Sequence, residues 1–179
     1  TVLVQVFGET RGLDLGSAVV FSDAVKKVPL APALIGRIFN GSFVPIDGHP
    51  MFIPERWQPI SGYPVNPTAR ARPEEFIETG VSAIDGLNTL VKGQKLPIFS
   101  CAGLPAKEVA ACILRNARLA GGGSFVVVFV ALGLSHHEYA FYMETLREMR
   151  TGFLGVVNRA GEPVVERLLA PRFGLAAAE

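Results

Sequence analysis

The sequence predicts an α/β protein whose main part is a parallel sheet, preceded by part of a small β-barrel. Between residues 96 and 157, strand-like and helix-like segments alternate in the order β-α-β-α-β, which is typical of a parallel sheet with right-handed crossovers. Residues 125–132 are apolar throughout, as expected for a central parallel strand covered on both faces. Turn residues separate short β-rich runs in the first 50 residues, and this spacing favours a small barrel.

Three β-rich runs support the partial barrel predicted for residues 1–50. Thr1–Phe7 alternates valines with other residues at a period of two, which is typical of a half-buried strand. Ser17–Phe21 is the second run, and Ile35–Val44, interrupted by Asn40-Gly41, is the third. Because the chain begins within the first run, we expect further barrel strands upstream.

A proline-rich connector is predicted after the barrel. Prolines recur through residues 49–75, so regular structure is not expected there. We assign residues 51–75 to the connector and residues 76–179 to the first half of an α/β domain. Pro73–Phe76 is predicted to open a short helical turn, since proline is favoured at the first helical position. Val81–Leu90 has the spacing of a short amphipathic helix.

The strands of the α/β domain are predicted from short apolar runs bounded by turn residues. They are Leu96–Phe99, Phe125–Leu132 and Phe153–Val157. The helices are predicted from apolar periodicity and from helix start signals. They are Pro105 to about Leu119, a helix from the capping box Ser135–Glu138 to about Met149, a short helix from Pro163 to Ala170-Pro171, and the start of another at residues 173–179.

The loop after the first of these strands is similar to a phosphate-binding loop in shape but not in chemistry. A strand, a glycine-containing loop and a helix together offer backbone N–H groups to a phosphate. A strict loop reads G-x-x-x-x-G-K-S/T, in which the lysine reaches the phosphates and the hydroxyl holds Mg²⁺. Ser100, Pro105, Ala106 and Lys107 occupy its four defined positions here.

Two interpretations of this loop stay open: weak nucleotide contact, or an ordinary strand-to-helix turn without a ligand. For the first, the candidate nucleotide-binding residues are Ser100, Cys101, Ala102, Gly103, Leu104, Pro105, Ala106 and Lys107. No residue of the chain is assigned a catalytic or metal-binding role.

Composition argues against several classes of protein. A net charge of +1 over 179 residues lacks the basic face expected of a nucleic-acid-binding protein. No apolar run reaches the ~20 residues that span a bilayer, and the N-terminus has no signal-peptide pattern. The two cysteines, Cys101 and Cys112, do not form a disulfide or metal-site pattern. We therefore expect a reducing, cytoplasmic setting. Only 18% of the residues are charged, which suggests that neighbouring subunits cover much of the surface.

Several individual residues could carry chemistry, but each has a simpler explanation. His136 and His137 stand beside Glu138, yet adjacent helical residues point about 100° apart and the capping box already accounts for the glutamate. Cys101 could be a reactive thiol near a helix N-terminus, although a small loop residue is the simpler interpretation.

Three arginines could contact an acidic partner or a phosphate. Arg70 and Arg72 lie in the connector, and Arg172 lies near the C-terminal end of the chain. We interpret the first two as solvated or as facing another subunit, and Arg172 as structural or interfacial.

Phrases along nearly the whole chain resemble one family, the B subunits of the vacuolar/archaeal-type rotary ATPases. The matching phrases are VQVFGETRGLDL (4–15), GRIFNGSFVPIDGHP (36–50), NPTARARPEEFIETGVSAIDGLNTLVKGQKLPIFS (66–100), GLPAKEVAACI (103–113), VVFVALG (127–133) and PVVERLLAPRFGLAAAE (163–179). They occur in family order, which is far more specific than any single loop motif. Two departures are local: Lys107 stands where many members have asparagine, and the linker at 121–123 is short.

The resemblance implies a P-loop NTPase-like sheet and a ring of alternating subunits. The chain would be a fragment holding the later barrel strands, the connector and the first half of the nucleotide domain. Its partners would be the catalytic A subunit, the central rotor and the peripheral stalk. The complex would translocate protons or sodium ions, and this subunit would meet the membrane only through the complex. No tightly bound cofactor is implied beyond ATP or ADP with Mg²⁺ at a subunit interface.

The resemblance also implies a subunit that does not catalyse hydrolysis. In catalytic relatives a loop lysine neutralises phosphate charge, and a glutamate after the second core strand positions the attacking water. The corresponding residues here are Ala106 and Leu134. Two alternatives stay open, a catalytic ATPase in which Lys107 replaces the missing lysine and a stand-alone α/β binding domain.

Overall fold

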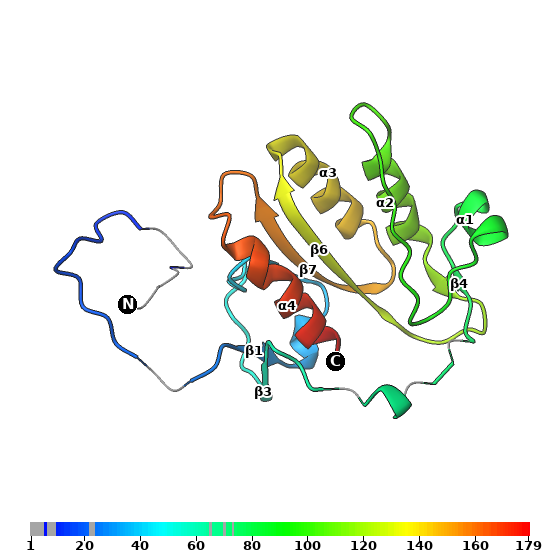
Figure 1. The fold of residues 1–179 in the computed structure, drawn as a ribbon. Coiled ribbons are helices and arrows are strands. Elements are labelled where there is room, and N and C mark those ends of the chain that lie inside the picture. Colours follow the sequence, from blue (N-terminus) through cyan, green and yellow to red (C-terminus); the bar gives the residue numbers. More distant parts are fainter. Residues whose placement is uncertain (1–5, 7–9, 22–23, 65, 70, 73) are drawn as a thin grey trace. The chain divides into compact units, whose positions relative to one another are not determined.

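The structure is a computed structural model that describes residues 6, 10–21, 24–64, 66–69, 71–72 and 74–179. Within these ranges the protein is of mixed α/β type, with strands of two to nine residues and four α-helices (Figure 1). It divides into two compact units. The first contains residues 1–63, 128–136 and 153–179, and the second contains residues 64–127 and 137–152. Two short 3-10 helices, Pro32–Leu34 and Pro67–Ala69, lie outside the sheets.

A three-stranded sheet forms the centre of the first unit, in the order β2 (Arg37–Asn40), β7 (Gly152–Arg159), β6 (Val126–Leu134). β2 runs parallel to β7, with Arg37 opposite Leu154. Residues 154–158 of β7 are all buried, because a strand covered on both faces has no solvent side. The predicted α/β class with a parallel sheet is confirmed, as are the strands predicted at 125–132 and 153–157.

The central place predicted for residues 125–132 is wrong. β6 lies at the edge of the sheet, and most of its residues are only half-buried. β7 takes the central place, since β2 occupies its other side. An apolar run shows that a strand is shielded from water, but it does not specify which neighbour provides the shielding.

Helix α4 (Glu166–Ala178) packs on the sheet of the first unit. Ala170, Phe173 and Ala176 are buried in one cluster with residues of β1, β2 and β7. Gly174 permits the close approach to β6, because a Cβ at this position would lie 2.4 Å from Cγ2 of Val130.

The helix break predicted at Ala170-Pro171 is also wrong. Pro171 lies inside α4, which continues to Ala178 as one helix. A proline removes one backbone hydrogen bond and crowds the preceding turn. Burial of Phe173 and Ala176 on the sheet side offsets this cost, so the helix continues beyond the proline.

An aromatic stack joins β2 to α4. Phe43 has a φ of +64°, which is unfavourable for a bulky residue. Its ring stacks on Phe39 at 4.3 Å and on Phe173 at 5.1 Å between centroids. Asn40 holds the turn, because its side-chain oxygen accepts hydrogen bonds from the amides of Ser42 and Val44 at 3.0 and 2.8 Å. β2 therefore ends at Asn40-Gly41, as the sequence predicts.

A two-stranded antiparallel sheet in the first unit has no counterpart in the prediction. β1 (Lys27–Leu30) pairs with β3 (Arg56–Pro59), which lies in the connector expected to lack regular structure. Pro59 is tolerated because both strands of a two-stranded sheet are edge strands. Val28 and Gln58 are buried in this pair.

The other β-rich runs of the first 50 residues give mixed results. Ser17–Phe21 is not a strand, since it has no regular structure and exposes Val20 and Phe21. Thr1–Phe7 lies outside the described residues except for Val6. The division into a barrel (1–50), a connector (51–75) and half a nucleotide-binding domain (76–179) stays a prediction.

In the second unit, β4 (Ile77–Glu78) pairs with β5 (Arg118–Leu119), and the helices are α1 (Ser82–Leu87), α2 (Ala106–Asn116) and most of α3 (His136–Arg147). These confirm the helices predicted at 81–90, 105–119 and 135–149, with ends a few residues shorter. The helical turn predicted from Pro73 is wrong: Glu74 and Glu75 have no regular structure, and Phe76 forms a β-bridge with Val91.

Side-chain contacts also tie segments of this unit together. Asp85 of α1 accepts hydrogen bonds from the hydroxyl and amide of Thr79 and from the Gly80 amide, which lower the pKa of its carboxyl. Arg115 of α2 reaches Glu148 at 2.8 Å and the buried Thr145 hydroxyl at 3.4 Å. None of the helices in the described residues has the length and apolar character that crossing a bilayer requires.

Candidate functional site

The segment that leads into the candidate loop is not the strand that the sequence predicts. Leu96–Phe99 has no regular structure, and Ile98 and Phe99 are 50% and 93% exposed. A strand needs a neighbouring backbone for its N–H and C=O groups, and no described strand pairs with this segment. The loop is therefore preceded by an irregular, exposed segment, and the predicted strand at 96–99 is wrong.

The loop itself turns sharply into helix α2. Gly103 has a φ of +88°, and the Leu104 amide donates to the Cys101 carbonyl at 3.3 Å. Ser100 donates its hydroxyl to the same carbonyl at 3.1 Å. Pro105 is the N-cap and α2 begins at Ala106, so the loop-to-helix junction lies where the sequence predicts it.

The side chain of Lys107 makes its contacts away from the preceding loop residues. Its Nζ lies 3.9 Å from Glu108 Oε1 and 5.4 Å from the centre of the Phe141 ring on α3. An ion pair and a cation–π contact together stabilise the ammonium group in this position. Burial raises the pKa of the neighbouring Tyr142, and the carboxylates of Glu138 and Glu108 raise it further.

The loop residues do not fit a Mg²⁺ site. Lys107 stands at the position of the hydroxyl that would hold the ion, and Ala106 provides no charge for the phosphates. The first N–H groups of a helix lack intrahelical partners, so the start of α2 can offer amide donors to a phosphate. Glu108 places a carboxylate in the same first turn, which weakens the attraction of an anion. Nucleotide contact by Ser100–Lys107 stays a prediction.

The end of β6 carries Leu134 at the position where the resemblance implies a water-positioning glutamate in catalytic relatives. Leu134 is its last residue and is 9% exposed. Its carbonyl accepts a hydrogen bond from the Ala160 amide at 2.8 Å. Helix α3 begins at His136, so Ser135 stands at the N-cap position that the predicted capping box requires.

The other residues singled out from the sequence are dispersed. His136 and His137 are exposed, and the described residues contain no group of three metal-ligating side chains. Cys101 is exposed and Cys112 half-buried, and both are free thiols. Arg72 is exposed beside a shallow hollow that Lys92 also lines.

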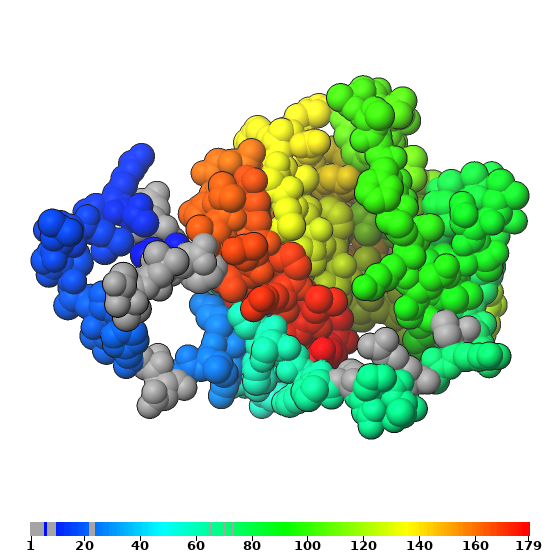
Figure 2. Space-filling model, viewed as in Figure 1, coloured from blue at the N-terminus to red at the C-terminus, as the bar shows by residue number. Residues whose placement is uncertain are grey.

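Of the remaining two arginines, the structure describes only Arg172. Arg172 is exposed on α4, which lies open along the face shown in Figure 2. It lines a hollow of about 380 Å³ together with Ile60 and Leu175. Arg70 lies outside the described residues.

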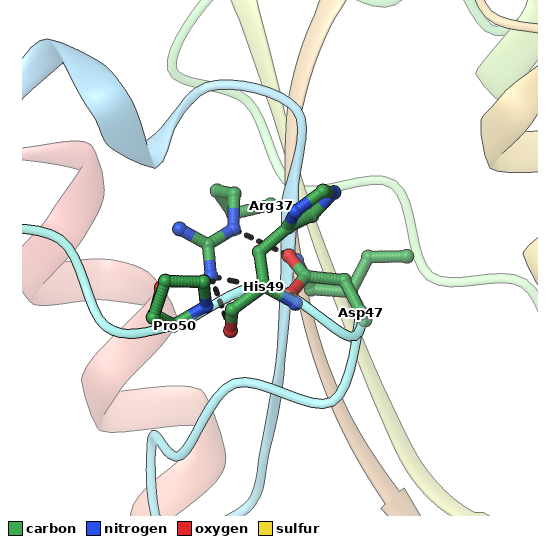
Figure 3. Close-up of polar contacts among 5 residues, drawn as sticks. Arg37, Asp47, His49 and Pro50 are labelled. Carbon is green, nitrogen blue, oxygen red and sulfur yellow. Dashed lines mark hydrogen bonds and ion pairs between the residues drawn. The ribbon is translucent and has the colours of Figure 1, made fainter.

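One polar cluster escaped sequence reasoning altogether. Arg37 on β2 donates from Nε and Nη2 to both carboxylate oxygens of Asp47, and from Nη2 to the Pro50 carbonyl at 2.9 Å (Figure 3). Asp47 also accepts hydrogen bonds from the Ile38 and His49 amides at 3.1 Å. Both side chains are nearly buried, at 14% and 10% exposed. The cluster fixes the chain after β2. From the sequence, Asp47-Gly48 indicates only a turn.

The comparisons with known proteins all match ATP synthase subunits. The sequence profile of the ATP synthase alpha/beta family, nucleotide-binding domain, matches residues 80–179. The V-type ATP synthase beta chain of Geotalea uraniireducens is 75% identical over 179 residues, which are 100% of this chain and 41% of that protein. The protein of the same name from Thermus thermophilus is 46% identical over 190 residues, covering 99% of this chain and 39% of the relative.

Two further comparisons give related names. The B subunit of the A-type ATP synthase of Methanopyrus kandleri is 48% identical over 183 residues, covering 99% of this chain and 18% of that protein. A solved structure of the ATP synthase subunit NeqB from Nanoarcheaum equitans superposes with a TM-score of 0.73 at 32% identity, over 86% of this chain and 37% of that one. The chain thus spans about two fifths of the length of the V-type relatives.

The expected resemblance to V/A-type B subunits is confirmed by these names, and the nucleotide-binding-domain profile covers α1, α2, α3, α4 and the strands between them. The profile extends over more than half of the chain. The chain therefore belongs to the ATP synthase alpha/beta family.

Proposed function

We propose that this chain is part of a non-catalytic, regulatory nucleotide-interface subunit of a rotary V/A-type ATPase. In this proposal it alternates with catalytic A subunits in a hexameric ring. The relatives named as the beta chain of V-type and the B subunit of A-type ATP synthases support the assignment to a rotary complex. The non-catalytic role rests on the chemistry of this chain.

The position of the Lys107 side chain is the main support for a non-catalytic role. Phosphoryl transfer depends on a cation at the phosphates and on a group that positions the nucleophile. Lys107 is the one cation in the loop Ser100–Lys107, and its ammonium contacts Glu108 and the Phe141 ring. Ala106 and the buried Leu134 supply neither function. The chain therefore lacks both parts of a hydrolytic centre at the positions where the family would place them.

The role we propose is structural. The subunit forms one wall of a nucleotide site and transmits closure to its neighbours, the catalytic A subunits. It also contacts the central rotor and peripheral stalk, in a soluble head on the cytoplasmic side of the membrane. The complex moves protons or sodium ions. ATP or ADP binds weakly at the start of α2, and any Mg²⁺ comes with the nucleotide, since the loop lacks the hydroxyl that would hold it.

Phosphate release from ATP in the presence of Mg²⁺ tests this proposal. We expect the purified chain to show no hydrolysis above buffer, because no charged group stabilises the transferring phosphoryl. Lys107→Ala is expected to leave that result unchanged. The matched control is Lys92→Ala, which removes an exposed lysine that pairs with Glu75.

Two outcomes would overturn the proposal. If the chain alone hydrolyses ATP and Lys107→Ala abolishes the activity while Lys92→Ala does not, the catalytic alternative is correct. If the chain fails to co-purify with a catalytic A-type subunit and remains a monomer, it is a stand-alone binding domain. Co-purification with that subunit, followed by hydrolysis that appears only in the mixture, is the expected result.

A further inference from the structure

A guanidinium group is held in a fixed position at the carboxyl end of the parallel sheet. Arg167 of α4 donates from Nε to Oδ1 of Asn158 at 2.9 Å. Asn158 lies near the end of β7 and is fully buried, and its amide nitrogen reaches the Pro163 carbonyl at 3.4 Å. Because the asparagine is bonded on both sides, it sets the orientation of the arginine.

A glycine allows this guanidinium to approach the backbone closely. Gly133, near the end of β6, has a φ of +68°. A Cβ at this position would lie 3.2 Å from Cζ of Arg167 and 3.4 Å from each of its terminal nitrogens. The guanidinium therefore lies close against the backbone, where a side chain on residue 133 would crowd it.

The terminal nitrogens of Arg167 have no acceptor among the described residues, and no described carboxylate lies within 4.0 Å of this side chain. The adjacent Glu166 forms no ion pair with it, and its carboxylate accepts a hydrogen bond from the Ser42 hydroxyl at 2.7 Å. A half-buried guanidinium without a counter-ion is costly. Its fork of donors matches an oxyanion.

A hollow opens at the same end of the sheet. This hollow of about 320 Å³ is lined by the residues that follow Gly133 and Asn158 in the chain, which are Leu134, His136, Arg159, Ala160, Gly161 and Glu162. The one carboxylate among them, Glu162, is neutralised by Arg159 at 2.8 Å. Ligands of open α/β sheets bind at the carboxyl ends of the strands, and Arg167 brings its guanidinium to this end.

We propose that Arg167 is the anchor of an oxyanion site that takes a phosphate group, supplied either as inorganic phosphate or as the terminal phosphate of a nucleotide. Asn158 and Gly133 act as its positioning residues. The site uses no residue of the loop Ser100–Lys107 and so does not depend on nucleotide contact there.

Titration calorimetry of the full chain with inorganic phosphate tests the proposal. We expect Arg167→Gln to weaken phosphate binding by roughly ten- to hundredfold, the effect of losing a hydrogen bond to a charged group. Arg172→Gln is the matched control, because it removes the same charge from an exposed position of the same helix. It is expected to bind like the wild type. Thermal unfolding of each variant checks that it is folded.

A second variant keeps the test decisive if Arg167→Gln does not fold. Arg167→Lys retains the charge but not the planar fork, and it is expected to bind phosphate more weakly than the wild type and more tightly than Arg167→Gln. A parallel titration with ADP identifies the source: ADP binding that falls with phosphate binding indicates a nucleotide, and unchanged ADP binding indicates free phosphate. The proposal is overturned if the wild type binds no phosphate, or if the Arg167 variants bind it as the wild type does. Either result leaves the hydrolysis and co-purification outcomes unaffected.

Discussion

Phe173→Ala is expected to lower the free energy of unfolding by about 3–5 kcal/mol, the range for truncating a buried aromatic residue. Phe173 is fully buried on α4 and lies in one cluster with Phe39 and Val156. Its ring stacks on Phe43 at 5.1 Å. Phe43 has a positive φ that this stack helps to stabilise, so the loss should also loosen the turn after β2. Urea unfolding followed by circular dichroism measures the change.

Phe99→Ala is the matched control, since it makes the same substitution at a side chain that is 93% exposed. Surface substitutions of this kind usually change stability by no more than about 0.5 kcal/mol. If both variants lose the same stability, α4 does not pack through Phe173 as described. Equal stability of Phe173→Ala and the wild type would contradict the buried cluster directly.

Stability is expected to fall by roughly 2 kcal/mol between about pH 4 and pH 2 through Asp47 alone. Burial by itself would raise the pKa of this carboxyl. Hydrogen bonds from the Arg37 side chain and from the Ile38 and His49 amides, together with the Arg37 charge, outweigh burial and lower the pKa from 3.8 to about 2. A carboxyl with a lowered folded-state pKa stabilises the fold above its unfolded-state value. That stability is lost as the pH falls towards the folded-state value.

Urea unfolding at a series of pH values measures this loss. Asp47→Asn keeps the shape of the side chain but cannot titrate, so its stability should depend less on pH over the same interval and should be lower at neutral pH. Glu144→Gln is the control, because Glu144 is exposed on α3 and forms no ion pair among the described residues. A wild-type pH profile that Asp47→Asn reproduces would show that the Arg37–Asp47 cluster contributes no such stability.

The helices of the second unit were predictable because their signals are local. Pro105 at the start of α2 and the Ser135–Glu138 box at the start of α3 act within a few residues of themselves. The missing chemistry of the loop was equally plain, since Ala106 has no charge in any fold. Family membership could also be predicted, because long phrases of sequence persist among the relatives.

The pairing of strands could not be predicted in the same way. Ser17–Phe21 and Leu96–Phe99 have strand composition but no described partner, whereas the proline-containing β3 found one in β1. A strand is stabilised by backbone hydrogen bonds and side-chain contacts to residues distant in the sequence. Composition therefore shows which segments can pair, and the available neighbours determine which do.

Residue identity alone was enough to establish the family, the α/β class and the absence of a lysine and a glutamate at the expected catalytic positions. Other features emerged only when the chain was folded. In the folded chain β7, and not β6, is the central strand of the sheet, and α4 continues beyond Pro171. Asn158 and Gly133 both lie against Arg167. Each of these outcomes is fixed by contacts between residues far apart in the chain, whose energies no local pattern contains.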